Sequence, residues 1–270
     1  MTLHAPAPGR AFRHAPQGRK GRARTTRAWD GHPLAGHLDR ITLPATGAWA
    51  FGRIPKTGTH TVLAALHELE FGTPISTAVA DPANTADDTA PHLLDAAGLF
   101  YTIPQAGTLP DQMDAALRFT VIRQPVMRAL SGFAYLGRSH AARSRHLAPV
   151  RLRMTALTGF DWGRDPDTAG GFDRFLDFIA LALDIRRFPL DGHIAPQSAA
   201  LPADAFAADL TGRTEELGPF LTRLAKALDR PPPPAMQRNA TPHPEFALSP
   251  DARRRCEALF AADMDWYERA

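Results

Sequence analysis

Cysteine is almost absent from this chain of 270 residues, since Cys256 is its single example. One cysteine excludes an internal disulfide framework and fits a reducing compartment. The sequence also lacks the run of roughly 18 to 20 apolar residues that would span a bilayer, and its N-terminus lacks the apolar core of a secretory signal peptide. We therefore expect a cytoplasmic protein without a transmembrane segment.

A strong net charge of either sign is missing as well. The formal net charge is +3, with 22% charged and 44% hydrophobic residues, which is ordinary for a globular protein. A mild basic excess suits an anionic ligand but does not by itself indicate nucleic acid, so we expect no nucleic-acid partner. At this length the chain can bury a sizeable core.

Acidic residues are missing from the first part of the chain, where none precedes Asp30, although arginine and lysine are frequent there. Because large apolar residues are few in this part, we predict that residues 1–40 form a disordered basic arm and that residues 41–270 form the folded domain. A solvated tail is the simplest role for the arm. A contact with nucleic acid or a membrane surface and an organelle-targeting segment are the alternatives.

The most informative stretch is residues 49–69, WAFGRIPKTGTHTVLAALHEL. We expect a first strand region over 41–54, in which residues 49–54 form a buried strand, and the spacing of the later leucines predicts a helix ending near Leu69. A strand, a glycine-bearing loop and a helix start direct backbone N–H groups and the positive end of a helix dipole at one point. That arrangement is a site for an anion such as phosphate, the alternative being a plain turn before a surface helix. The predicted anion-binding residues are those of the loop and the first helical turn, Pro55, Lys56, Thr57, Gly58, Thr59, His60 and Thr61. Lys56 adds a positive charge, and the threonines add hydroxyl donors for the phosphate.

The lysine of this loop is misplaced for an ordinary nucleotide-triphosphate loop. Lys56 precedes Gly58 by two residues, whereas the pattern GxxxxGK[ST] places the lysine after the second glycine. The segment PKTGT instead resembles the 5′-phosphosulfate loop of sulfotransferases, which use 3′-phosphoadenosine 5′-phosphosulfate (PAPS).

A second strand–turn–helix signal lies at residues 118–134, where the β-branched and aromatic run RFTVIR is followed by Pro125 and by apolar residues at helical spacing. Two such β-α units predict an α/β fold in a single domain, with a parallel sheet flanked by helices. In sheets of this kind, ligands bind at the carboxyl ends of the strands, where both loops would lie.

Residues 123–131, RQPVMRALS, resemble the 3′-phosphate motif RDPxxRxxS of sulfotransferases. The guanidinium of Arg123 and the hydroxyl of Ser131 could bind one phosphate from two sides, although a surface arginine at a strand end is the plainer interpretation. Gln124 and His60 depart from the family pattern, which has Asp and commonly Ser or Thr at these positions. Three later segments resemble the Golgi-type carbohydrate sulfotransferases in particular: GHIAPQ at 192–197, TGRTEEL at 211–217, and RNAT at 238–241 followed by a helix with Asp263 and Tyr267.

The resemblance runs from about Ala48 to Tyr267 and implies a P-loop-like sulfotransferase. Such an enzyme moves a sulfonate group from PAPS to a hydroxyl of a carbohydrate or related small acceptor. The resemblance assigns Lys56 to the oxygen that bridges sulfur and phosphorus, residues 58–61 to the 5′-phosphate, and Arg123 with Ser131 to the 3′-phosphate. It places a loop containing Arg238, Asn239 and Thr241 over the nucleotide. It requires no metal, and the sequence has no cluster with zinc-ligand spacing.

The general base is ambiguous in the sequence. His193 is the first candidate because its segment recurs in the family that the chain resembles, and His92 is the second because acceptor-side groups lie in that stretch. His60 is a third, and a purely structural histidine is the alternative at each position. Arg53 either attracts an acidic sugar or faces solvent.

Two rival functions remain open. A P-loop kinase is disfavoured by the position of Lys56 and by the lack of an evident magnesium-binding acid. A non-catalytic nucleotide-binding module stays possible because the base is uncertain. The sequence fixes neither the acceptor nor the oligomeric state.

Overall fold

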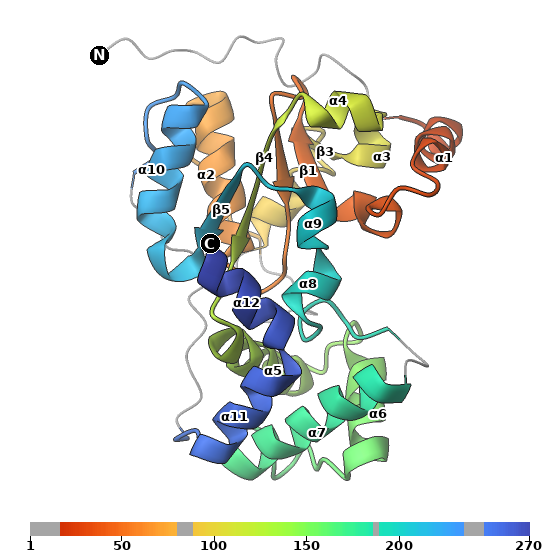
Figure 1. Cartoon of the computed structure of the whole chain (residues 1–270), viewed down its shortest axis with the longest axis vertical. Coiled ribbons are helices and arrows are strands. Elements are labelled where there is room, and N and C mark those ends of the chain that lie inside the picture. Colours follow the sequence, from red (N-terminus) through yellow and green to blue (C-terminus); the bar gives the residue numbers. More distant parts are fainter. Residues whose placement is uncertain (1–16, 80–88, 186–188, 235–245) are drawn as a thin grey trace. The chain divides into compact units, whose positions relative to one another are not determined.

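The computed structural model describes residues 17–79, 89–185, 189–234 and 246–270 (Figure 1). The single domain expected from the sequence consists of two compact units. Within the described residues, the first unit contains 17–79, 89–122 and 198–234, and the second contains 123–185, 189–197 and 246–270.

The first unit is an α/β structure built on a five-stranded mixed sheet with the strand order β3-β1-β2-β4-β5. Strands β2–β4 and β4–β5 pair in parallel, whereas β1 is antiparallel to both β2 and β3. The strands are β1 (Ile41–Pro44), β2 (Trp49–Gly52), β3 (Phe100–Thr102), β4 (Leu117–Ile122) and β5 (Leu210–Arg213).

The predicted parallel sheet is therefore confirmed only in part. Residues 41–54, which we expected to form one strand region, form two strands because the chain reverses at Gly47. Gly47 has a φ of +67°, which glycine adopts without strain, and its N–H donates to the carbonyl of Pro44 at 3.0 Å. The α/β class and the β-α order after β2 and β4 are confirmed.

Two helices cover one face of this sheet, α2 (Thr59–Phe71) and α10 (Leu217–Ala227), which lie side by side in Figure 1. Trp49 and Phe51 of β2 contribute to the core beneath them. Side chains alternate along a strand, so Gly52 belongs to the opposite face. There Phe206, at the end of α9 (Ala203–Phe206), approaches so closely that a Cβ on Gly52 would lie 2.9 Å from its ring.

Short elements complete the first unit. They are η1 (Ala35–Arg40), η2 (Ala90–Leu93), α3 (Ile103–Ala106), α4 (Pro110–Asp114) and η3 (Thr214–Glu216). Helix α8 (Gln197–Ala200) leads the chain from the second unit back into the first.

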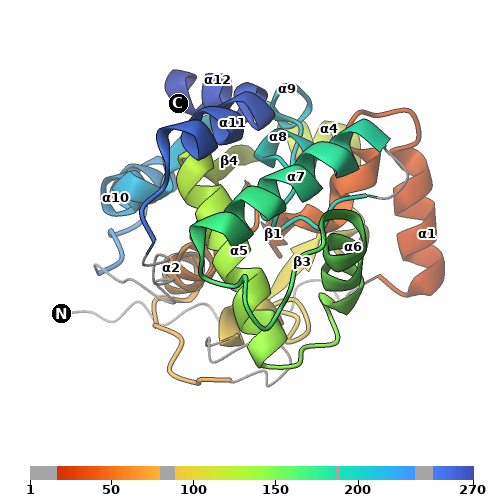
Figure 2. The same ribbon diagram turned by 90° about the horizontal axis from the view of Figure 1, so that it is seen from below.

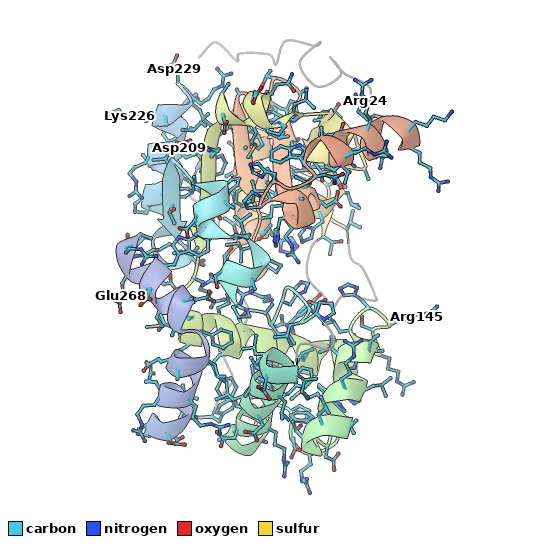
Figure 3. The ribbon with its side chains drawn as sticks, turned by 45° about the vertical axis from the view of Figure 1, so that its right-hand side comes forward. Arg24, Arg145, Asp209, Lys226, Asp229 and Glu268 are labelled. Carbon is cyan, nitrogen blue, oxygen red and sulfur yellow. The ribbon has the colours of Figure 1, made fainter. Side chains whose placement is uncertain are left out.

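Residues 19–40, which we expected to belong to a disordered basic arm, instead contain the helix α1 (Arg19–Ala28) and η1. The sequence interpretation gave too little weight to Trp29, Leu34 and Leu38, which are all buried. The Trp29 indole N–H donates to the carbonyl of Thr108 at 3.0 Å, and α1 packs against α3. The basic side chains point outward, as Arg24 does in Figure 3. Residues 1–16 lie outside the described residues.

The second unit is helical in its described part, and Figure 2 shows its helices packed on one another. The helices are α5 (Pro125–Ala141), α6 (Ala148–Thr158), α7 (Ala169–Ile185), α11 (Pro250–Leu259) and α12 (Ala261–Arg269). Phe133 lies at the centre of its aromatic core and contacts Phe160, Phe172 and Phe175. The single C-terminal helix that we predicted is two helices, which meet at Phe260.

None of the helices in the described ranges has both the length and the apolar character that a membrane span requires.

Candidate functional site

The predicted anion loop of the first unit joins β2 to α2 and contains two residues with a positive φ. Lys56 has a φ of +71° and Gly58 a φ of +82°. Glycine adopts this left-handed conformation freely, but for lysine it costs on the order of 1 to 2 kcal/mol. Such strain is often retained at functional positions, although Arg143, Asp167, Ala207 and Asp229 also have a positive φ. The conformation is therefore compatible with a role for the Lys56 side chain but is not specific to one.

The loop is braced by its own threonines. The hydroxyls of Thr57 and Thr59 both donate to the carbonyl of Ile54, at 2.8 and 2.9 Å, and both side chains are buried. Each hydroxyl has one proton, so these two protons are already used inside the loop. We had expected them to donate to phosphate. The donors that helix geometry leaves for an anion are instead the N–H groups of the first turn of α2.

Arg53, which leads into the loop, is bonded to two backbone carbonyls of the first unit. Its backbone N–H and its Nε both donate to the carbonyl of Arg40, at 2.8 and 3.4 Å, and its guanidinium also donates to the carbonyl of Asp39. Burial lowers the pKa of Arg53 from its usual value. The side chain therefore fastens the start of the loop to the end of η1.

Two of the predicted base candidates are brought together in the first unit. The rings of His60, in the first turn of α2, and His92, in η2, have centroids 4.2 Å apart in an edge-to-face arrangement. His92 is exposed and His60 is half-buried. The fold thus places an accessible imidazole beside the helix start that the loop of Lys56 opens.

The predicted 3′-phosphate residue Arg123 directly follows β4, and distant segments of the second unit hold its backbone. The side chain of Gln197 accepts a hydrogen bond from the N–H of Arg123 and donates one to its carbonyl, both at 2.9 Å. The N–H of Gln197 donates to a carboxylate oxygen of Asp263 in α12 at 2.6 Å, and Gln197 and Asp263 are both buried. Gln197 and Asp263 therefore fix the direction in which Arg123 leaves the strand.

Gln124, which follows Arg123, caps a helix. Its side-chain oxygen accepts from the N–H of Met127 at 2.8 Å and so caps the start of α5. An aspartate would accept the same bond. A glutamine in place of the aspartate of the RDPxxRxxS pattern therefore keeps this helix cap.

Ser131, the other predicted 3′-phosphate residue, lies on α5 and is 2% exposed. Its hydroxyl has no hydrogen-bond partner among the described residues. Buried hydroxyls are nearly always bonded, so an unpaired one needs an explanation, and a bound ligand is one.

The segment 191–197 is anchored on α5 by Arg128, which is buried and donates to the carbonyls of Ala195 at 2.6 Å and Gly192 at 2.7 Å. Gly132, one turn later, permits this approach, since a Cβ there would lie 2.7 Å from the carbonyl oxygen of His193. The arginine inside the RDPxxRxxS-like motif thus has a structural task.

His193, our first candidate for the base, is bound to Asp191. One oxygen of Asp191 accepts from the His193 backbone N–H at 2.9 Å and pairs with its Nδ1 at 2.7 Å. The His193 ring also stacks on Tyr135, with centroids 4.7 Å apart. Burial raises the pKa of Asp191, but the hydrogen bonds and charge of His193 outweigh it and lower the pKa to about 2. Asp191 is therefore ionised and fixes the imidazole.

The last three predicted nucleotide-binding residues come from the segment before the C-terminal helices. Arg238, Asn239 and Thr241 lie outside the described residues.

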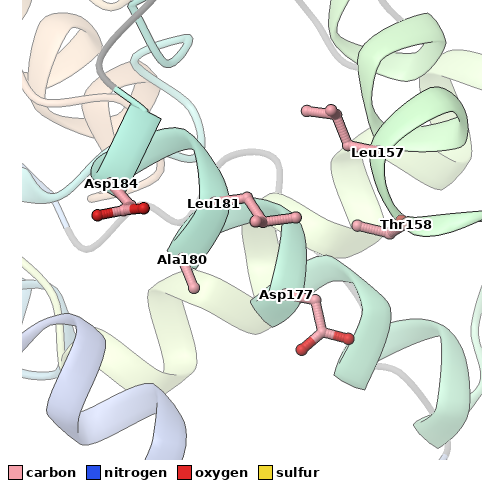
Figure 4. Close-up of a pocket in the computed structure, with 6 residues that line it drawn as sticks. All are labelled: Leu157, Thr158, Asp177, Ala180, Leu181 and Asp184. Carbon is pink, nitrogen blue, oxygen red and sulfur yellow. The ribbon is translucent and has the colours of Figure 1, made fainter.

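A cavity of about 530 Å³ lies between α6 and α7 in the second unit (Figure 4). It is lined by Leu157 and Thr158 of α6 and by Asp177, Ala180, Leu181 and Asp184 of α7. Its two carboxylates would repel an anionic nucleotide, so the cavity is not a candidate for the phosphate site.

Comparisons of the chain with protein-family models, with curated proteins and with solved structures gave no match. The fold and the contacts described above are therefore the observations on which a function has to be argued.

Proposed function

We propose that the protein is a PAPS-dependent sulfotransferase with a P-loop-like core, acting on a hydroxyl of a carbohydrate or related small acceptor. One observation supports it most. The neighbouring strands β2 and β4 are parallel, so their carboxyl ends lie at one edge of the sheet, and each runs into a helix start. Lys56 follows the first strand, and Arg123 follows the second directly. The carboxyl edge of such a sheet is where nucleotides bind.

In the proposed reaction the donor supplies an activated sulfonate group, and the protein supplies binding and charge stabilisation. The N–H groups of the first turn of α2 would bind the 5′-phosphate, and the ammonium of Lys56 would stabilise the negative charge that develops on the leaving oxygen. Arg123 and Ser131 would bind the 3′-phosphate, which a guanidinium can contact with two parallel hydrogen bonds. The unpaired, buried hydroxyl of Ser131 fits this task.

For the base that accepts the proton of the attacking hydroxyl, we propose His92 in preference to His193. His92 is exposed and contacts His60 in the first turn of α2, which is the helix start that follows Lys56. The ring of His193 is instead fixed by Asp191 and Tyr135. The same contacts would suit a structural histidine, so the two residues need separate tests.

The experiment that tests the function supplies PAPS with a panel of carbohydrate and small hydroxyl acceptors and follows release of 3′-phosphoadenosine 5′-phosphate (PAP). Acceptor-dependent PAP release is the expected result. With an active acceptor, His92→Ala should lower the turnover number by about 10²-fold or more, whereas His193→Ala should retain far more activity. The reverse order would restore His193 as the base.

The same experiment separates the rival functions. Magnesium-dependent turnover of ATP in place of PAPS would identify a kinase-like phosphotransferase. Tight PAP binding without turnover on any acceptor would indicate a non-catalytic nucleotide-binding module. Absence of both binding and turnover would refute the whole nucleotide assignment.

A further inference from the structure

Three side chains that are suited to a metal ion lie together in the second unit, namely His146, Asp191 and His193. Each offers one ligand atom, and these atoms all lie within 4.8 Å of one another. His146 comes from the connection between α5 and α6, and the other two come from the segment before α8. The spacing of these residues in the sequence did not predict a metal site, because the fold brings together segments that are far apart in the chain.

The cluster is partly fixed and partly adjustable. Asp191 and His193 are half-buried and bonded to each other, and the His193 ring is stacked on Tyr135. His146 is exposed, and its ring stands edge-on to that of His193 with centroids 6.2 Å apart. Two ligands are thus held in place by the protein, while the third can rotate to meet an ion.

The hydrogen bond between Asp191 and His193 has a consequence for ligation. One carboxylate oxygen of Asp191 and the Nδ1 of His193 lie 2.7 Å apart, close enough for one ion to contact both residues. Metal ligands have to be deprotonated, so a bound ion would take the place of the proton between these two atoms.

We propose that His146, Asp191 and His193 bind a divalent transition-metal ion, for which zinc is the probe. Two imidazoles and one carboxylate favour such ions over magnesium or calcium, which prefer oxygen ligands throughout. Zinc ligands lie at about 2.0 to 2.2 Å from the ion, so they stand roughly 3.4 Å apart in a tetrahedron. A small rotation of the exposed His146 and a slight separation of Asp191 from His193 would bring the cluster to that spacing, with water completing the coordination.

Such an ion would act as a clamp on the segment 191–197. That segment ends at Gln197, whose side chain holds the backbone of Arg123, and Arg128 already fixes it to α5. The ion would add a third attachment, from the connection that precedes α6. This inference goes beyond the proposed sulfotransferase activity and does not depend on it.

The test is zinc binding by the full chain after removal of metals with a chelator, measured by competition with a chromophoric zinc indicator. The wild-type chain should bind zinc in a one-to-one complex. The His146→Ala variant should bind it at least about tenfold more weakly. His140→Ala is the matched control, because His140 is also exposed in the second unit but stacks on Trp162, outside the cluster. This control should bind zinc like the wild type.

Equal zinc affinity for the wild type and His146→Ala, or no zinc binding by the wild type, would overturn the proposal. Because His146 is exposed, the His146→Ala variant should have the same far-ultraviolet circular dichroism spectrum as the wild type. If its spectrum differs, His193→Gln is the second variant with which zinc binding is tested. Zinc should also raise the melting temperature of the wild type and of His140→Ala, but not that of either cluster variant.

Discussion

The two units differ in the kind of polar side chain that they bury. In the described part of the first unit, the buried polar side chains are all threonines, including Thr57, Thr59 and Thr120. The second unit buries the charged groups Arg128, Arg151, Asp165 and Asp263, together with Gln197 and three serines.

This difference reflects two ways of shaping a site. The loop of Lys56 is braced by hydroxyls that donate to a carbonyl a few residues away. The backbone of Arg123 is fixed by Gln197 and, through it, by Asp263, which are remote in sequence. A locally braced loop can lose a functional side chain without losing its shape. A position fixed by distant groups cannot lose them without losing stability as well.

The largest expected effect is on the locally braced loop. Lys56→Ala should abolish measurable sulfonate transfer, a loss of at least about 10³-fold, because no other group would stabilise the leaving oxygen. Alanine meets the same backbone strain as lysine at a φ of +71°, so the free energy of unfolding should change by less than about 0.5 kcal/mol. PAP release and denaturant unfolding measure the two quantities. The control Lys226→Ala, on the exposed side of α10, should leave both unchanged, and near-normal transfer by Lys56→Ala would contradict the assigned role.

Gln197→Ala should instead affect stability and binding together. It leaves the backbone N–H and carbonyl of Arg123 without their partner, which should lower the free energy of unfolding by about 2 to 3 kcal/mol. PAP affinity should fall by about tenfold, because the direction of Arg123 is no longer fixed. Gln112→Ala is the control, since its side chain bonds locally to the N–H of Leu109. An unchanged PAP affinity in Gln197→Ala would show that the hydrogen bonds do not position Arg123.

The buried charges should also make the second unit the more acid-sensitive one. The N–H of Asp161 donates to Asp165 and lowers the pKa of that carboxyl from its ordinary value, an effect that burial opposes and that Arg164 and Arg174 reinforce. Because the folded-state pKa is depressed, the stabilisation is complete above the unfolded pKa and is lost as pH falls through the folded value. Unfolding measured from pH 7 to pH 3 should show a steeper loss for the wild type than for Asp165→Asn. Parallel curves for the two proteins would contradict this assignment.

The smallest expected effect is a difference in stability between alanine variants at two glycines of α5. Gly132→Ala should destabilise the protein by about 1 to 3 kcal/mol, because its Cβ would meet the carbonyl oxygen of His193. Gly137→Ala, where the nearest atom is a Pro166 carbon at 3.7 Å, should be neutral or stabilising by up to about 1 kcal/mol. Melting temperatures of the two variants measure the difference. Equal shifts would mean that α5 and the segment 191–197 are not tightly packed.

The sequence predicted the elements whose signals are local. The strand β4 and the start of α5 at Pro125 follow from apolar periodicity and from proline placement, and both are present. The loop before α2 was also predicted, although the hydroxyls that brace it were assigned to phosphate. Local patterns did not show that β1 is antiparallel or that Trp29 anchors α1, because both depend on distant partners.

The candidate site, too, could be predicted from the sequence only in part. Its residue types could be proposed from motifs, but the anchoring of Arg123 by Gln197 and the cluster of His146 with Asp191 and His193 could not, because each joins separate segments. The pairing of His60 with His92 was equally invisible, even though both histidines were named as candidates. Periodicity and spacing describe one segment at a time, whereas these contacts exist only once the chain has folded.

The central claim is that Lys56 and Arg123 act on one doubly phosphorylated adenosine. Its most direct test is calorimetric binding of PAP and of adenosine 5′-monophosphate, which lacks the 3′-phosphate, to the wild type and to Arg123→Ala. We predict that the wild type binds PAP more tightly than the monophosphate. Arg123→Ala should lose about 100-fold in PAP affinity, the worth of a charged phosphate contact, but less than about threefold for the monophosphate. Equal losses for the two nucleotides, or no preference for PAP in the wild type, would contradict the claim.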